Sequence, residues 1–574
     1  MTTRSVADEV SLEERVARLE QALAAERARV AELTQERDKL RASHERLRLE
    51  IELLRRRIFV AKAERVDTQQ LELEFADKLQ QLDALAGTLG LGKTDEDDEP
   101  EGAGASERKR RTKPKGRRDL RTLAIPEDRI ELTDPLFEEL VAAGKAERFD
   151  VEESVKLGYK RGGLLRVVVA RAKYRVIKED GSTTVATTPM PEEAFPRLLA
   201  TPSLLAHILM EKYGRGLPLF RIEEGFARDG VPIDRGTMCR WVEDAGGTAG
   251  STVIAAARRE ATATAFCIAT DATGVAVQPD RSGDKARRAC RRGHYFVQIA
   301  DRDHVFFEYT AKETSASVRA LFKGYSGYVQ ADAKSVYDVL YREPDEKPPD
   351  DDGICTEVAC WAHLRRRFWE AALAKSVLGR EGLVRISRIF ELEASWRGKP
   401  PSEIKRLRDE HLRPHADAFF GWAALEYERV KGERGYERSA LGYAVRQRDA
   451  LLRVFEDGKL VLDNNRSERE LRRIAVGRKA WLFVGSDDHA EAAGHVFSLI
   501  ASARLHRLDP ETYLRDFFRV LPHWPRDRYL ELAPKYWAAT RARLDADELA
   551  RELGPLVVPA PAAAEQEAPA DVSS

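Results

Sequence analysis

Two aspartates in the chain each follow a short apolar run that is typical of a buried strand. Asp271 comes directly after residues 265–270, and Asp332 comes directly after residues 327–331. An aspartate at the end of a strand often only caps the following turn. Carboxylate oxygens are also the ligands that Mg²⁺ prefers, and Mg²⁺ keeps part of its water shell, so a few carboxylates at one sheet edge can bind it. The pair is therefore a candidate metal site.

A third acid on a nearby helix would complete a site that holds two metal ions for in-line displacement at phosphorus. The candidates are Asp463, Glu468, Glu470 and Glu491. Asp463 ends the aliphatic run 460–462, the expected fifth strand, and suits the capping of the helix that follows. Glu470 points about 200° around that helix from Glu468, at 3.6 residues per turn. Only one of these two side chains can therefore face the metal ions.

The helix that starts near Asn465 has two interpretations. Glu468 shares a face with Asn464 and Leu471, nearer to the strand end where the aspartates are expected to gather. Alternatively, Asn465 and Glu468 have the spacing of a capping box, a common start for a solvated helix. Taken alone, this segment favours the capping box; the two aspartates upstream favour a third metal ligand.

The elements around the aspartates predict the fold that must position them. Apolar runs at 265–270, 295–299 and 305–309 are expected strands, 315–322 is an expected helix, and 327–331 is a fourth strand. Three strands, a helix and a strand, with acids closing the first and fourth strands, is the order of the ribonuclease-H-like fold. Adjacent central strands of that fold place both carboxylates side by side.

A long helical interval separates Asp332 from Glu468. Residues 361–453 carry apolar positions at helical spacing, which predicts an all-α insertion between the fourth and fifth strands. Cys360 and His363 stand at its start with the spacing of a metal pair. Two ligands do not make a zinc site, so a structural or substrate-facing histidine is the preferred interpretation.

The regions before this core suggest oligomerisation and DNA binding. Apolar residues repeat every seven positions from 12 to 61, which predicts a coiled coil, with a helical hairpin as the alternative. A charged linker follows, and its basic run suits phosphate contacts: Arg108, Lys109, Arg110, Arg111, Lys113, Lys115, Arg117 and Arg118. Residues 120–190 are β-rich. Two short helices about Gly230 predict a helix-turn-helix, with Arg235 and Arg240 on the polar face of the second, although a plain helical hairpin is as common.

Composition narrows the class of protein. The chain has 574 residues with a net charge of −1 although 34% of them are charged, so the balance neither favours nor excludes nucleic acid. Its five cysteines include no Cys-x-x-Cys pair, which fits a reducing cytoplasm. No apolar run reaches the length of a membrane span, and the N-terminus lacks a signal-peptide core. These features indicate a soluble, intracellular protein with no membrane partner.

Asp271, Asp332 and the segment 463–486 (DNNRSERELRRIAVGRKAWLFVGS) resemble the bacterial transposases of the insertion sequence 66 family. Residues 202–226, 360–371 (CWAHLRRRFWEA) and 498–517 carry the same resemblance. The resemblance implies an Asp-Asp-Glu core in which Asp271, Asp332 and Glu468 are the catalytic residues and bind two Mg²⁺ ions, with Mn²⁺ as an alternative. It also implies double-stranded DNA partners, both the insertion-sequence ends and the target, together with small helper proteins.

The sequence departs from the family pattern at three places. The family's cysteine-rich zinc segment corresponds to residues 132–154, which contain no cysteine, so no zinc is expected. The family's Asp-Glu-Thr is Asp271-Ala272-Thr273 here, and its Asp-Gly-Tyr is Asp332-Ala333-Lys334. The metal-binding acids are present while their neighbours differ.

The expected protein is an α/β multidomain transposase with a ribonuclease-H-like catalytic core and a large all-α insertion, preceded by a coiled coil and a helix-turn-helix-like region. It would act at the bacterial nucleoid as a homo-oligomer, with Arg469, Arg472 and Lys479 neutralising phosphate. The alternatives are a non-catalytic DNA-binding or regulatory protein that keeps the core as a scaffold, and a related nuclease without strand transfer. The expected division is coiled coil 1–70, linker 71–119, β-rich domain 120–190, helical DNA-binding region 191–260, first core part 261–345, insertion 346–455, end of core 456–520, C-terminal helices 521–557 and disordered tail 558–574.

Overall fold

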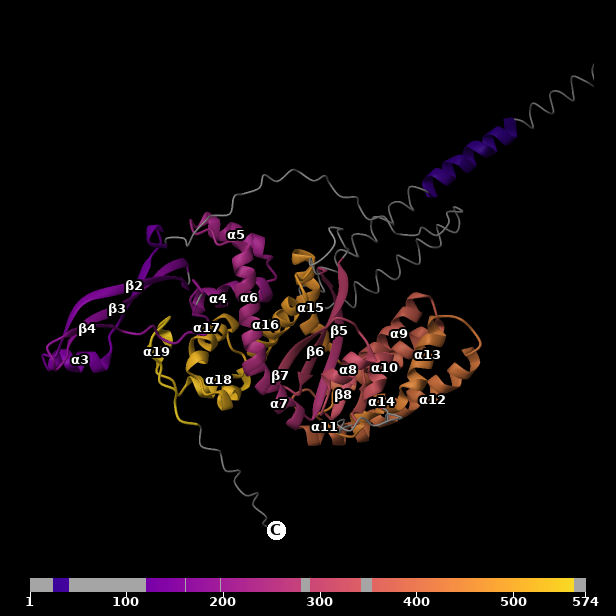
Figure 1. Ribbon diagram of the computed structural model, residues 1–574. Helices are drawn as coiled ribbons and strands as arrows, with labels where there is room; N and C mark the ends of the chain where they lie inside the picture. The colour runs from indigo at the N-terminus through magenta and orange to yellow at the C-terminus, as the bar shows by residue number, and fades with distance from the viewer. Residues whose placement is uncertain are drawn as a thin grey trace, which may run out of the picture. The chain divides into compact units, whose positions relative to one another are not determined.

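A computed structural model describes residues 24–40, 120–160, 162–196, 198–279, 290–341 and 354–561 (Figure 1). The chain divides into two compact units, Met1–Lys115 and Gly116–Ser574. In the first unit, residues 24–40 form a helix within the expected heptad region, and nearly all of its side chains are exposed. The rest of that region, the basic run 108–118 and residues 562–574 lie outside the described residues.

The second unit begins with a four-stranded sheet. Its strands run in the order β1-β3-β2, with β4 paired to the other part of β3; β1 is parallel to β3, and the remaining pairs are antiparallel. The expected β-rich region is therefore present, with strands longer than expected and one helix, α3, that the sequence did not reveal. The bounds are β1 Glu127–Leu132, α3 Pro135–Ala142, β2 Ala146–Lys160, β3 Gly163–Ile177 and β4 Thr183–Thr187.

Helices follow, and they include the two predicted about Gly230. Helices α5 and α6 are separated by a turn in which Gly230 has a φ of 79°, a left-handed conformation that favours glycine. Asp234 caps α6 by accepting hydrogen bonds from the amides of Gly236 and Thr237. The two helices are thus confirmed as helices, and α6 packs on α16. The bounds are α4 Pro202–Leu209, α5 Leu219–Arg228, α6 Arg235–Ala249, α7 Ala255–Thr264 and α16 Asp487–Leu505.

The central sheet has five strands in the order β7-β6-β5-β8-β9. Strands β5, β6 and β7 are antiparallel neighbours, whereas β8 is parallel to both β5 and β9. The four predicted strands and the predicted helix are all found. The bounds are β5 Cys267–Val277, β6 Arg291–Ala300, β7 His304–Thr310, α8 Ser315–Leu321, β8 Tyr328–Ala331 and β9 Thr356–Ala359.

The prediction for the fifth strand was wrong. The fifth strand is β9, which precedes the helical region, and residues 460–462 form no strand. Leu460 and Leu462 are only 1% and 3% exposed because they pack into the core of the helical region. Their burial explains the aliphatic run without a strand ladder, while β9 is too short to stand out in the sequence. The helices therefore lie between the fifth strand and α15, not between the fourth and fifth strands.

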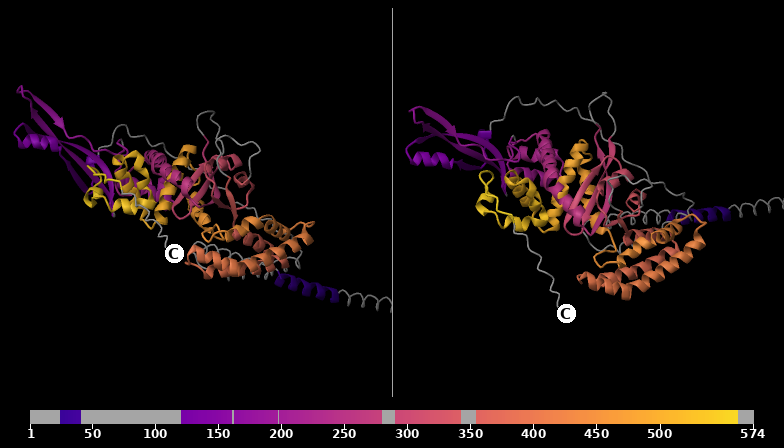
Figure 2. Two further views of the ribbon diagram at one scale, coloured as in Figure 1. Left: turned by 90° about the horizontal axis from the view of Figure 1, so that it is seen from below. Right: turned by 60° about the horizontal axis from the view of Figure 1, so that its bottom comes forward.

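The helical region is an α-helical bundle with a hydrophobic core of its own. Trp361, Phe368 and Phe419 are fully buried in that core, and the indole N–H of Trp361 donates to the Leu451 carbonyl at 2.9 Å. Figure 2 shows these helices grouped together, separate from the yellow C-terminal helices. The bounds are α9 Trp361–Leu373, α10 Val377–Ser395, α11 Pro401–Leu407, α12 Arg413–Val430, α13 Tyr436–Arg446 and α14 Arg448–Leu452.

Helix α16 covers the outer strand of the central sheet. The hydroxyls of Ser498 and Ser502 accept hydrogen bonds from the amides of Phe307 and Val305 in β7, at 2.8 and 3.0 Å. These bonds satisfy backbone donors that an edge strand would otherwise leave unpaired. The sheet is thereby sealed on the side away from β9.

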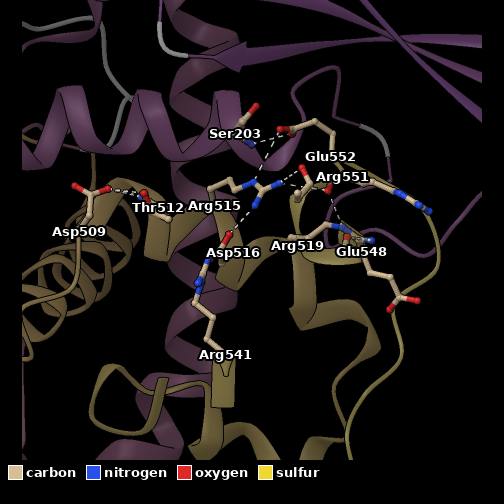
Figure 3. Close-up of polar contacts among 11 residues, drawn as sticks. Ser203, Asp509, Thr512, Arg515, Asp516, Arg519, Arg541, Glu548, Arg551 and Glu552 are labelled. Carbon is tan, nitrogen blue, oxygen red and sulfur yellow. Dashed lines mark hydrogen bonds and ion pairs between the residues drawn. The ribbon is translucent and has the colours of Figure 1, made fainter. Parts of the chain in front are cut away.

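The C-terminal segment is tied to α17 by buried arginines (Figure 3). Arg519, only 2% exposed, donates to the carbonyl oxygens of Arg551 and Gly554, both at 3.0 Å. Burial lowers its pKa to about 10. The predicted tail begins too early, because Arg528 and Arg543 also hold the carbonyls of residues 559 and 560. The remaining bounds are α15 Asn465–Trp481, α17 Pro510–Val520, α18 Pro534–Arg541 and α19 Ala546–Ala550.

One ion-pair network joins α7 to α18 and predicts an acid-sensitive contact. Burial opposes ionisation of Glu260, but hydrogen bonds from His304, Tyr536 and Lys535 lower its pKa from 4.5 to about 2. The stabilisation is therefore present above pH 4.5 and is lost as the pH falls from about 4.5 to about 2. We expect Glu260→Gln to lower the free energy of unfolding by roughly 1–3 kcal/mol at pH 7, measured as a lower melting temperature.

The control for this variant is Glu224→Gln, at an exposed position on α5. It should leave the melting temperature unchanged. The difference between Glu260→Gln and the unmodified protein should also shrink below pH 4. A difference that persists unchanged at low pH would contradict the assignment of this stabilisation to the Glu260 charge.

Candidate functional site

The two aspartates meet where β8 separates from β5. The parallel register pairs Ile268 with Val329 and Ala269 with Gln330, so two further steps along each strand lead to Asp271 and Asp332. Strand β8 ends at Ala331, whereas β5 continues to Val277 beside β6. The expectation that Asp271 ends its strand was therefore wrong, because β6 extends the pairing of β5 well past it. The sheet is open beside Asp271 because β8 ends there while β5 continues along β6.

Burial and the charges of two other acids act on Asp271. The pKa of Asp271 is raised from 3.8 to about 6, first by burial and then by the negative charges of Asp332 and Glu468. The Ala272 amide, which donates to Asp271 Oδ1 at 2.7 Å, and the Lys334 ammonium oppose this shift. Asp332 has an unsatisfied acceptor at this site, since its Oδ1 is buried and accepts no hydrogen bond.

Helix α15 presents Glu468, not Glu470, to the aspartates. The carboxylate of Glu468 lies 3.5 Å from His363 Nε2, whereas Glu470 pairs with Arg473 at 3.0 Å. The capping-box interpretation is wrong: the N-cap is Asn464, and it makes no side-chain capping bond. The amide of Asn465 donates to Asp463 Oδ1 at 3.1 Å, so Asp463 stabilises the turn before the helix, whereas the expected N-cap role belongs to Asn464.

Asn464 is a positioning residue that the sequence did not reveal. Its side-chain amide donates to the Thr270 carbonyl at 2.6 Å, directly before Asp271, and it is 1% exposed. Its backbone N–H donates to Cys360 Sγ at 3.2 Å. Since the carbonyl of Asn464 accepts from the Glu468 amide at 3.3 Å, one residue joins β5, the start of α9 and the first turn of α15. The sequence placed Asn464 on the helix face shared with Glu468, but its position between Asp463 and a charged helix resembles an ordinary turn.

Cys360 and His363 face different partners. Cys360 is buried, its pKa is raised to about 11 chiefly by burial, and its sulfur faces the Asn464 amide. His363 instead faces Glu468, and its Nδ1 is buried without a hydrogen-bond partner. Within the described ranges, no three His, Cys, Asp or Glu side chains are grouped closely enough to hold a metal ion as they stand.

The candidate phosphate-binding residues lie on two helices. Arg469, Arg472 and Lys479 are exposed along α15, the helix that carries Glu468. Arg235 and Arg240 are exposed on α6. Arg469 and Arg472 lie within about one turn of Glu468 on α15, Lys479 lies about three turns from it, and Arg235 and Arg240 lie on a separate helix. The eight basic residues of the linker lie outside the described part of the chain, and in the described part no helix is long and apolar enough to cross a membrane.

Comparisons with known proteins agree with this arrangement. A family model described as "Transposase IS66 family" matches residues 197–492, more than half of the chain, and includes all three acids. Two further models match: "IS66 C-terminal element" at residues 498–534 and "Transposase C of IS166 homeodomain" at residues 46–125.

Two similar proteins come from Sinorhizobium fredii. Its uncharacterized proteins y4hP and y4qI are 27% and 26% identical to this chain over 62% and 64% of its length. The matched region covers 66% of y4hP and 68% of y4qI, so the chain spans slightly less than two thirds of the first relative. No solved structure matches the chain. Because the family model covers more than half of the sequence, the chain belongs to the IS66 family of transposases.

Proposed function

We propose that the chain is an Asp-Asp-Glu transposase that cleaves the ends of an insertion sequence and joins them to target DNA. The core would be ribonuclease-H-like, which the strand order β7-β6-β5-β8-β9 supports, since antiparallel strands lie on one side of β5 and parallel strands on the other. The observation that carries the proposal is the parallel register of β5 and β8, which brings Asp271 and Asp332 together, with Glu468 near enough for its charge to act on Asp271.

The three acids fit divalent metal ions by their chemistry. Carboxylates are the oxygen ligands that Mg²⁺ and Mn²⁺ accept. A buried Asp332 Oδ1 without a hydrogen-bond partner is costly unless a ligand completes it. The repulsion among the three acids would likewise be relieved by cations. Glu468 is 43% exposed, so its side chain is free to turn from His363 toward the aspartates.

Bound metal ions would supply a polarised attacking oxygen and a stabilised leaving oxygen for phosphoryl transfer. The chain's own residues do the positioning. Strand β5 fixes Asp271, and the Asn464 amide holds the start of α15 against the carbonyl before it. Arg469, Arg472 and Lys479 would neutralise the phosphates of a DNA strand lying along α15.

Oligomerisation is part of the proposal. Val30 and Leu33 occupy seam positions of the heptad and are 60% and 57% exposed on the helix 24–40. Apolar seams of this kind are normally covered by a second helix. A coiled coil formed by 12–61 would pair two copies at the two DNA ends, with small helper proteins as further partners at the nucleoid.

The test uses a supercoiled plasmid that carries the chromosomal segment encoding the chain with both of its flanks. Incubation with the purified protein and Mg²⁺ should produce joined molecules that contain the segment at a new position. Cleaved but unjoined DNA would instead support the nuclease alternative. Bound but intact DNA would support the scaffold alternative and contradict the proposal.

We also expect duplex binding to weaken steeply with salt. Each neutralised phosphate releases a counterion, so the logarithm of affinity falls with the logarithm of salt concentration. Neutralising Lys109, Arg110, Arg111 and Arg117 together should reduce that slope by about 3–4, measured by fluorescence anisotropy with labelled duplex DNA. An unchanged slope would show that the linker makes no phosphate contacts.

A further inference from the structure

We propose that Lys334 is an internal cation that competes with divalent metal for Asp332 and thereby sets the metal concentration that the protein requires. The inference rests on the proposed function, because it concerns the same acids. It assigns a role to a residue at which this chain departs from the family pattern.

The geometry places Lys334 on the acids in two ways. Its Nζ lies 3.4 Å from Asp332 Oδ2, which leaves the buried Oδ1 of Asp332 without a partner. Its backbone N–H donates to the Asp332 carbonyl at 2.7 Å, so the turn holds the backbone of Lys334 beside Asp332 in every rotamer of its side chain. The backbone therefore keeps Lys334 within reach of the site.

The ammonium of Lys334 lies among carboxylates. It is 3.4 Å from one oxygen of Asp332 and 3.4 Å from one oxygen of Glu313. One ammonium thus offsets part of the repulsion that a metal ion would otherwise relieve, which makes the two cations competitors.

Glu313 is a second carboxylate partner of Lys334. Lys334 Nζ also lies 3.4 Å from Glu313 Oε1, and the other oxygen of Glu313 lies 3.6 Å from His294 Nε2. When a metal ion takes Asp332, Lys334 can keep its contact with Glu313. The competition is therefore partial, and because Lys334 is 44% exposed, solvent screens it further.

The test measures metal binding without activity. The full chain is melted at increasing MgCl₂, and separately MnCl₂, to find the concentration that gives half of the metal-induced rise in melting temperature. Lys334→Met should lower that concentration roughly tenfold, because a like charge next to the bound metal is removed. Glu313→Gln should raise it, because Lys334 then has only Asp332 as a carboxylate partner.

The matched control is Lys323→Met, at an exposed lysine just beyond α8, which should leave the concentration unchanged. A metal-induced rise with the same half-point in Lys334→Met and the unmodified chain would overturn the role of Lys334 and leave the proposed function intact. No metal-induced rise in either protein would overturn both. A rise only in Lys334→Met would support both.

A different role for Lys334 is distinguishable in the same proteins. If Lys334 contacts a DNA phosphate, Lys334→Met should weaken duplex binding in EDTA and leave the metal half-point unchanged. That pair of results would overturn the proposed competition.

Discussion

Glu468→Gln is expected to abolish Mg²⁺-dependent cleavage and joining, while Glu470→Gln leaves both within about threefold of the unmodified protein. Glutamine keeps the shape and one carbonyl oxygen of Glu468 but loses the charge that a hard cation requires. Removing one ligand of a two-metal site typically costs several orders of magnitude in rate. Glu470 differs because it pairs with Arg473 at 3.0 Å within one helix, and the loss of such a partly exposed i, i+3 ion pair has little effect.

The measurement is the appearance of cleaved strands and joined products with time, at saturating DNA. Both variants should retain duplex binding and the melting temperature within a few degrees. His363→Ala is measured beside these two variants. It removes the side chain that lies 3.5 Å from Glu468 and leaves the three acids in place, so it separates the role of this neighbour from that of the acids. Normal cleavage by Glu468→Gln, with loss of cleavage in Glu470→Gln, would show that α15 turns its other face to the metal ions.

Asp271→Asn is expected to abolish the same chemistry and yet to stabilise the metal-free protein. Ionised Asp271 is buried against two other acids, which raises its pKa from 3.8 to about 6. A raised pKa in the folded state means that stability falls as the pH rises from about 4 to about 6. Asparagine removes that loss and still accepts the Ala272 N–H bond, so the gain should be roughly 1–3 kcal/mol at pH 7.

This effect is measured as melting temperature against pH in EDTA. The variant should melt a few degrees higher than the unmodified protein above pH 6, and the two should converge near pH 4. Added Mg²⁺ should raise the melting temperature of the unmodified protein only. A variant that melts lower than the unmodified protein at pH 7 would show that burial and the neighbouring acids do not disfavour ionised Asp271.

Apolar runs predicted β6 and β7 because most of their residues are buried on both faces of the sheet. A strand buried on both faces reads as continuous hydrophobic sequence. The helix α8 between β7 and β8 was also predicted from the sequence. The short β9 escaped because four residues give too little pattern. Leu460 and Leu462 were taken for a strand because burial in a helical core produces the same aliphatic run.

By itself, the sequence determined which acids were candidates and how α15 is phased. The 3.6-residue period sets Glu468 and Glu470 on different faces wherever the helix lies. The tertiary structure alone decided what the start of α15 contacts: Asn464 donates to Thr270, and Glu468 lies beside His363. Both contacts join residues far apart in the chain, so no local pattern encodes them. Their geometry depends on where β8 leaves β5, and that divergence is set by packing across the whole sheet.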